Sequence, residues 1–186
     1  MSAQTALGTR QEKALAQRGT ALAPRGATAS LVEMCSVRVE SALYGIPIQY
    51  ILEIVGGALP QAVPLAPEFV GGLVHYRGDV LTTVSLRQLL GMASSIGRQD
   101  ILVLESAHGC FGLLVDAVGE VLTVSSADHE PNPSVLDGAG GNHRGQGSLD
   151  ERRRALFKGV YKLKDGLLVM LDPERLDPMR LGAVEA

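Results

Sequence analysis

Short apolar segments separated by turn signals recur along most of this chain. Cys35–Glu40 alternates apolar and polar residues, which is the pattern of a half-buried strand. Phe69–Tyr76 and Val80–Val84 flank an Arg77-Gly78 turn, and this arrangement predicts a β-hairpin. Lys164-Asp165-Gly166 is a second strong turn signal. The remaining predicted strands are 44–48, 101–105, 112–115, 117–124, 159–163 and 167–171.

Helical periodicity is brief wherever it occurs. Apolar residues between Ile48 and Val55 recur at three- and four-residue spacing, which predicts a helical turn after the second strand. Leu86–Met92 and Pro173–Leu181 are predicted as the other short helices. Three prolines between residues 60 and 67 indicate an irregular connection, because proline lacks a backbone hydrogen-bond donor.

The order of these elements indicates the fold class. The strands fall into two runs separated by residues 86–99, which favours an all-β protein of two small barrels over an alternating βαβ sheet. We expect the lobes at about residues 34–92 and 100–172, with about five strands in each.

Three segments are predicted to lie outside the lobes. Residues 1–31 lack sustained apolar periodicity and are expected to form a disordered N-terminal tail. Residues 131–155 are rich in glycine and are expected to form a long mobile loop. Residues 178–186 are expected to form a C-terminal tail.

Composition excludes several classes of protein. The net charge is −3 with no concentrated basic face, which argues against nucleic-acid binding. No apolar run approaches the roughly 18 residues that span a bilayer, and the N-terminus lacks the apolar core of a secretion signal. We therefore expect a cytoplasmic protein without direct membrane insertion. Cys35 and Cys110 are interpreted as buried, reduced thiols.

Motifs for catalysis and for ligand binding are missing from the sequence. The four histidines show no zinc-site spacing, and no serine lies in a Gly-x-Ser-x-Gly turn. The glycine-rich segment 138–141 lacks the preceding strand and the Lys-Ser of a phosphate-binding loop. We therefore predict no catalytic residue, no metal, no cofactor and no enzymatic activity.

Several ordered sequence blocks resemble the CheW-like domain family, which supplies adaptors of bacterial chemosensory arrays. Their order and spacing over residues 34–177 carry the resemblance, whereas each block alone is short. The blocks are Tyr44–Ile48, Ile51–Ile54, Val63–Pro67, Phe69–Gly78, Leu86-Arg87, Gly112–Val121, Gly159-Val160, Asp165-Gly166 and Leu171-Asp172.

The resemblance implies a fold and a function. The expected fold of residues 32–177 is two SH3-like, five-stranded β-barrel lobes around a shared hydrophobic core, with short helices. The expected function is a non-enzymatic adaptor of chemotaxis signal transduction that couples methyl-accepting chemoreceptors to the CheA histidine kinase. Such an adaptor would bind the cytoplasmic tip of the receptor and the regulatory domain of the kinase, and would be recruited to receptor arrays at the membrane.

The resemblance also implies a set of contact residues for these partners. Arg77 at the hairpin tip could bind carboxylates or carbonyls, or be a solvated turn residue. Glu53 would add charge specificity at an interface rim. Asp116 could instead be a strand-end residue that bonds the backbone. One or two apolar residues among positions 48–55 are expected to be exposed anchors. The predicted contact residues are Ile48, Ile51, Glu53, Ile54, Arg77, Gly78, Gly112 and Asp116.

Departures from the family pattern leave two alternatives open. His75, Tyr76, Thr82 and Ser85 stand where the pattern has asparagine, leucine, proline and aspartate. These changes favour an adaptor of another chemosensory-type pathway, such as surface motility or diguanylate-cyclase control. The second alternative is a small-molecule-binding or enzymatic domain, which a deep polar pocket holding His75 and Asp116 together would support.

Overall fold

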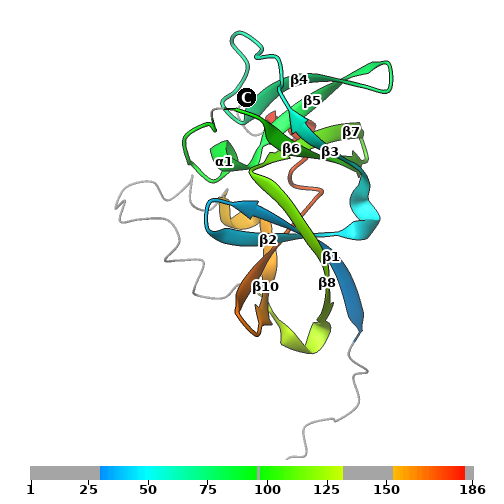
Figure 1. Ribbon diagram of the computed structural model, residues 1–186, viewed down its shortest axis with the longest axis vertical. Helices are drawn as coiled ribbons and strands as arrows, with labels where there is room; N and C mark the ends of the chain where they lie inside the picture. The colour runs from blue at the N-terminus through cyan, green and yellow to red at the C-terminus, as the bar shows by residue number, and fades with distance from the viewer. Residues whose placement is uncertain (1–29, 96, 132–152, 183–186) are drawn as a thin grey trace, which may run out of the picture.

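The computed structural model of the protein describes residues 30–95, 97–131 and 153–182. It is mostly strand with a few short helices, which confirms the all-β class (Figure 1). The strands are β1 Leu31–Val39, β2 Ala42–Pro47, β3 Ile51–Ala58, β4 Val70–Tyr76, β5 Asp79–Ser85, β6 Gln99–Ser106, β7 Gly109–Val115, β8 Ala117–Ser125, β9 His129–Glu130, β10 Phe157–Leu163 and β11 Gly166–Leu171. The helical turns are η1 Ile48–Tyr50, α1 Leu86–Leu89, η2 Ser126–Asp128 and α3 Pro178–Gly182.

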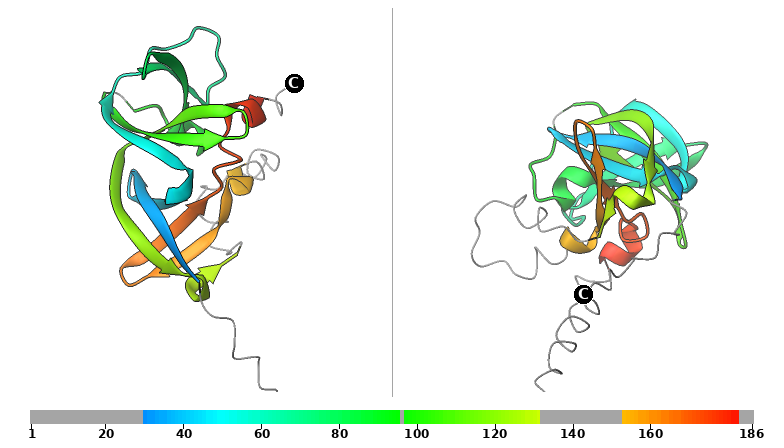
Figure 2. Two further views of the ribbon diagram at one scale, coloured as in Figure 1. Left: turned by 90° about the vertical axis from the view of Figure 1, so that its right-hand side faces the viewer. Right: turned by 90° about the horizontal axis from the view of Figure 1, so that it is seen from below.

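Two strongly curved sheets form the two lobes, one above the other along the long axis (Figures 1 and 2). The six-stranded sheet has the order β8-β1-β2-β11-β10-β9, and the five-stranded sheet has the order β3-β6-β7-β5-β4. Within the described ranges, the terminal strands of each sheet do not pair with one another. Both lobes are therefore open barrels.

The predicted division of the chain into lobes is wrong. The five-stranded sheet is built from residues 51–115, whereas the six-stranded sheet combines strands from both ends of the chain. The reason is the pairing of β1 with β8 and of β2 with β11, which joins strands far apart in sequence. Apolar alternation predicts that a strand exists, but it does not specify such a distant partner. The expected five strands per lobe hold for only one lobe.

The two sheets share one hydrophobic core, as the resemblance implied. Val37 and Ile46 of the six-stranded sheet belong to the same buried cluster as Leu102, Phe111 and Leu113 of the five-stranded sheet. All five side chains are almost completely shielded from solvent. Burial of this apolar surface joins the lobes into one folding unit, because neither sheet alone covers its inner face.

Three local predictions require correction. The helical turn predicted across 48–55 is confined to η1, and β3 follows it because pairing with β6 overrides the local apolar spacing. The C-terminal helix is shorter than predicted, and it occupies 178–182, where a tail was expected. Cys110 is exposed rather than buried, although both cysteines are free thiols as expected.

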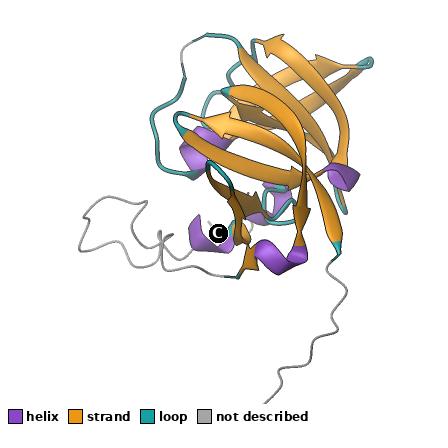
Figure 3. Ribbon diagram, turned by 60° about the horizontal axis from the view of Figure 1, so that its bottom comes forward, coloured by secondary structure: helices purple, strands orange, loops and turns teal. Residues whose placement is uncertain are grey.

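The predicted N-terminal tail and long loop lie almost entirely outside the described residues. At their described margins, Leu31 is the first residue of β1, and residues 153–155 are helical. In the parts of the chain that the structure describes, no helix is both long and apolar enough to cross a membrane. Figure 3 shows the short helical elements at the margins of the two strand layers.

Candidate protein-interaction site

The β4–β5 hairpin has the tight turn that the sequence predicted. Tyr76 pairs with Asp79, so Arg77 and Gly78 form a two-residue loop. Their φ angles are +52° and +94°, which is the left-handed backbone of a type I′ turn. Glycine adopts this conformation freely, and a β-carbon at Gly78 would meet nothing within 4 Å. The turn therefore places the Arg77 side chain at an open hairpin tip.

Glu53 connects this tip to the opposite edge of the five-stranded sheet. Its Oε2 accepts hydrogen bonds from the Tyr76 hydroxyl at 2.8 Å, Arg77 Nε at 3.1 Å and Arg77 Nη2 at 2.6 Å. Glu53 lies in β3 and Tyr76 in β4, which are the two terminal strands of the sheet. Side chains thus join β3 to β4, and just beyond β3 the backbone of Gln61 also bonds that of Leu73 in β4.

The Glu53–Arg77 pair is charged and accessible. Hydrogen bonds from Tyr76 and then Arg77 lower the pKa of the Glu53 carboxyl, and the hydrogen bond with Glu53 raises the pKa of Arg77. The side chains are 71% exposed for Arg77 and 38% exposed for Glu53. An ion pair this exposed contributes little to stability, so its groups are available for recognition.

Apolar side chains lie in η1 and β3, on the segment that carries Glu53. Ile48 and Ile54 are exposed, which agrees with the expectation of one or two exposed apolar residues in this segment. Leu52 is also exposed, and sequence reasoning missed it because it treated 48–55 as helical. Reading the segment with a period of two would have found it. Ile51 instead is half-buried and packs against the shared core.

Asp116 lies elsewhere and has partners within the chain. Its carboxylate accepts hydrogen bonds from Arg87 Nε at 2.6 Å and Arg87 Nη2 at 2.7 Å. It also accepts a hydrogen bond from the Glu40 backbone N–H at 2.8 Å. The hydrogen bond from Arg87 lowers the pKa of Asp116 more than burial raises it. This arrangement matches the alternative role of a strand-end residue that bonds the backbone. The pair connects α1 with the β1–β2 and β7–β8 turns.

The resemblance implied that Gly112 is a surface contact, but the structure buries this residue in β7. A β-carbon there would lie 2.8 Å from Ile101 Cγ2 and 3.0 Å from Thr83 Cγ2. Glycine is required because β5 and β6 pack closely on either side of this position. Of the eight predicted contact residues, the structure brings Glu53, Arg77 and Gly78 together, with Ile54 nearby on β3.

The small-molecule alternative needed one deep polar pocket that holds both His75 and Asp116. The pocket described below, among the described residues, is lined by neither of them. His75 is exposed opposite Val80 in the hairpin, while Asp116 is paired with Arg87. In the described ranges, no group of three or more His, Cys, Asp or Glu side chains could hold a metal ion.

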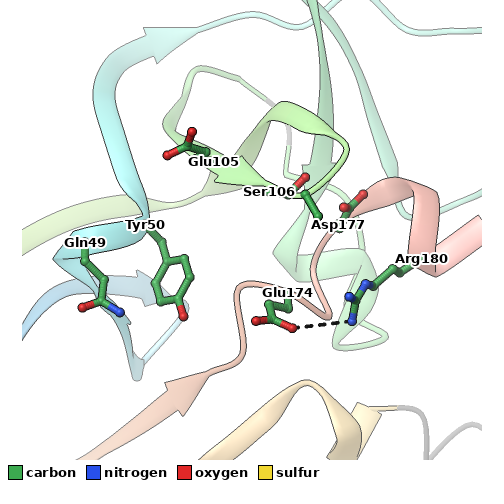
Figure 4. A pocket seen from close by; sticks show the side chains of 8 residues that line it. Gln49, Tyr50, Glu105, Ser106, Glu174, Asp177 and Arg180 are labelled. Carbon is green, nitrogen blue, oxygen red and sulfur yellow. Dashed lines mark ion pairs between the residues drawn. The ribbon is translucent and has the colours of Figure 1, made fainter.

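A pocket of about 470 Å³ lies at another place, between η1, the end of β6 and the C-terminal segment (Figure 4). Within it, Arg180 pairs with Glu174 at 3.6 Å, and the buried Asp177 bonds His108 Nδ1 at 2.7 Å. One ion pair thus joins two of the lining residues, and Asp177 is bonded by a residue outside the lining. The lining residues are Gln49, Tyr50, Glu105, Ser106, Ala107, Glu174, Asp177 and Arg180.

Comparison with known proteins agrees with this architecture. The chain is 36% identical over 148 residues to the chemotaxis protein CheW of Rhizobium meliloti, covering 78% of this chain and 87% of that protein. It is 32% identical over 146 residues to the probable chemotaxis protein CheW of Rhizobium etli, covering 77% and 86%. The crystal structure of the scaffolding protein TtCheW from Thermoanaerobacter tengcongensis has the same fold, with a TM-score of 0.64 and 22% identity over 80% of this chain and 94% of that chain. The CheW-like domain family matches residues 33–178, and this chain belongs to that family.

Proposed function

We propose that this protein is a non-enzymatic adaptor of chemotaxis signalling that couples methyl-accepting chemoreceptors to a CheA-type histidine kinase. The observation that carries the proposal is the accessible Glu53–Arg77 pair at the tip of the β4–β5 hairpin. Family membership supports it, because relatives of similar length are named chemotaxis proteins. The protein would act in the cytoplasm and be recruited to receptor arrays.

The receptor tip is assigned to the surface formed by Glu53, Arg77, Gly78 and the exposed apolar residues Ile48 and Ile54. The Nε and Nη2 atoms of Arg77 are both directed to Glu53 Oε2, so this edge of the guanidinium is occupied. A partner would meet Arg77 Nη1 and Glu53 Oε1, which offer a donor beside an acceptor. Neutral polar groups fit such a pair better than a lone carboxylate does. The apolar side chains would supply contact area.

This arrangement has a consequence for the dependence on salt. Arg77 and Glu53 neutralise one another, so this pair contributes little net charge for long-range attraction. Association with the receptor should therefore depend weakly on ionic strength. The regulatory domain of the kinase would occupy a separate surface, so that both partners are held at once. Receptor state would then influence the kinase through the free energy that couples the two binding events.

Isothermal titration calorimetry with a purified receptor signalling fragment and a CheA regulatory domain tests the proposal. Dissociation constants of about tens of micromolar or lower are expected, which is typical of transient interfaces. Arg77→Glu should abolish most of the receptor binding. Lys162→Ala removes an equally exposed ion pair, with Glu130 on β10 and β9, and should bind normally. Absence of binding to both partners would refute the adaptor assignment.

A further inference from the structure

Tyr76 joins the accessible ion pair to the core of the five-stranded lobe. It is half-buried at the end of β4 and packs against a buried cluster. That cluster consists of Leu81, Ile101, Val103 and Leu114. One end of the Tyr76 side chain is thus fixed by packing, while the hydroxyl end reaches Glu53. The family pattern quoted above has leucine at this position, so the hydroxyl is a feature of this chain.

Tyr76 acts on Arg77 in two ways, indirectly through the Glu53 carboxylate and directly through its aromatic ring. The Tyr76 hydroxyl donates to the same carboxylate oxygen that Arg77 Nε and Nη2 contact. The ring also lies beneath the guanidinium, with 5.2 Å between Arg77 Cζ and the ring centroid, which is a cation–π distance. The first contact orients the carboxylate, and the second restricts the plane of the guanidinium. An exposed ion pair without such contacts is usually poorly ordered.

We propose that Tyr76 is a positioning residue that orders Arg77 for the protein partner, by holding the Glu53 carboxylate and by stacking on the guanidinium. This inference rests on the proposed function of the surface that contains Arg77. Binding a partner normally orders flexible side chains at a cost in entropy. Because Arg77 is already ordered in the free protein, less of that cost remains when the partner binds.

The ordering itself can be measured without any partner. In ¹⁵N-labelled protein, the Arg77 Nε–H signal should show restricted motion and slow exchange with solvent. Arg175 is the internal reference, because it is 58% exposed, its Nε lies 3.7 Å from Asp172 Oδ2, and no aromatic ring of the described residues lies over its guanidinium. Tyr76→Phe keeps the ring and its packing but removes the hydroxyl. In this variant, Arg77 Nε–H should become more mobile, and the pKa of Glu53 should rise because its Tyr76 hydrogen bond is lost.

The effect on binding is then measured by calorimetry with the receptor fragment. Tyr76→Phe should weaken binding by about two- to fivefold, and Tyr76→Leu, which also removes the ring, by up to about tenfold. Tyr161→Phe, which removes the hydroxyl of a buried tyrosine in the other sheet, should bind like the wild type. The melting temperature of each variant separates loss of order from loss of fold.

The outcomes distinguish this inference from the function on which it rests. If Arg77 dynamics and the Glu53 titration are the same in Tyr76→Phe and wild type, Tyr76 is a packing residue and the inference is wrong. Weaker binding with unchanged melting temperature and greater Arg77 mobility supports it. If the wild type fails to bind the receptor fragment while the NMR measurements show the expected changes, the proposed function is refuted but the ordering of Arg77 by Tyr76 stands.

Discussion

Replacing Asp116 with asparagine should destabilise the protein without weakening partner binding. The variant keeps the size of the side chain but removes the negative charge that receives two Arg87 hydrogen bonds at 2.6 and 2.7 Å. These side chains are only 22% and 18% exposed, so solvent screens the interaction weakly. Charge-assisted hydrogen bonds contribute roughly 1.5–3 kcal/mol each when shielded, so a net loss of about 2–3 kcal/mol is expected after partial replacement by the amide.

Urea unfolding followed by circular dichroism measures this loss, and thermal unfolding should show a decrease of about 5–10 °C for a chain of this size. The pH dependence gives a second check. Because the folded-state pKa of Asp116 lies below its ordinary value, its stabilisation is present above the unfolded pKa and is lost as pH falls through the folded pKa. The difference between wild type and variant should therefore be constant from neutral pH to about pH 5 and shrink below about pH 4.

Glu130→Gln is the matched control, because it removes an exposed ion pair with Lys162 and should cost less than about 1 kcal/mol. The reasoning fails if Asp116→Asn changes the free energy of unfolding by no more than the control does. It also fails if the difference grows on acidification. Normal stability combined with lost partner binding would restore Asp116 to the contact surface, as the family resemblance implied.

Three further variants test other parts of the structure. Arg77→Ala should leave the melting temperature nearly unchanged while weakening receptor-fragment binding in calorimetry; a large loss of stability with intact binding would make Arg77 structural. Gly112→Ala should destabilise the protein by about 1–3 kcal/mol in urea unfolding, because its β-carbon has no space between β5 and β6; wild-type stability would contradict the packing described. The double variant Ile48→Ser, Ile54→Ser should fold normally, since both side chains are exposed, but bind the receptor fragment more weakly. Unaltered binding would remove these two apolar residues from the interface.

Sequence reasoning succeeded where the physical signal was local. The Arg77-Gly78 turn was predictable because few residues tolerate two successive positive φ angles, and the flanking apolar runs fix the hairpin. The lobes were assigned wrongly because the β1–β8 and β2–β11 pairings depend on contacts between distant segments. The apolar spacing after Ile48 fits both a helical turn and a strand, and only pairing with β6 decides between them.

Glu53, Arg77 and Gly78 of the candidate site were named from the sequence, but their contacts were not. Glu53 and Arg77 were both expected at an interface, yet nothing in the sequence places them within hydrogen-bond distance, because the contact depends on the curvature of the whole sheet. The role of Tyr76 was missed for the same reason. Asp116 was ambiguous from sequence, since its partner Arg87 becomes visible only when α1 is placed next to the β7–β8 turn.

The strands of one sheet lie in sequence between strands of the other, and this constrains the order in which strands find their partners during translation. Strands β3 to β7 are contiguous, so that lobe has all of its backbone partners soon after it emerges from the exit tunnel. The first two strands are synthesised earlier, but one edge of β2 waits for β11, which is translated after every strand of the other lobe. A nascent chain stalled before β11 would therefore carry one finished lobe and one with an unpaired edge, which is the form a chaperone would meet.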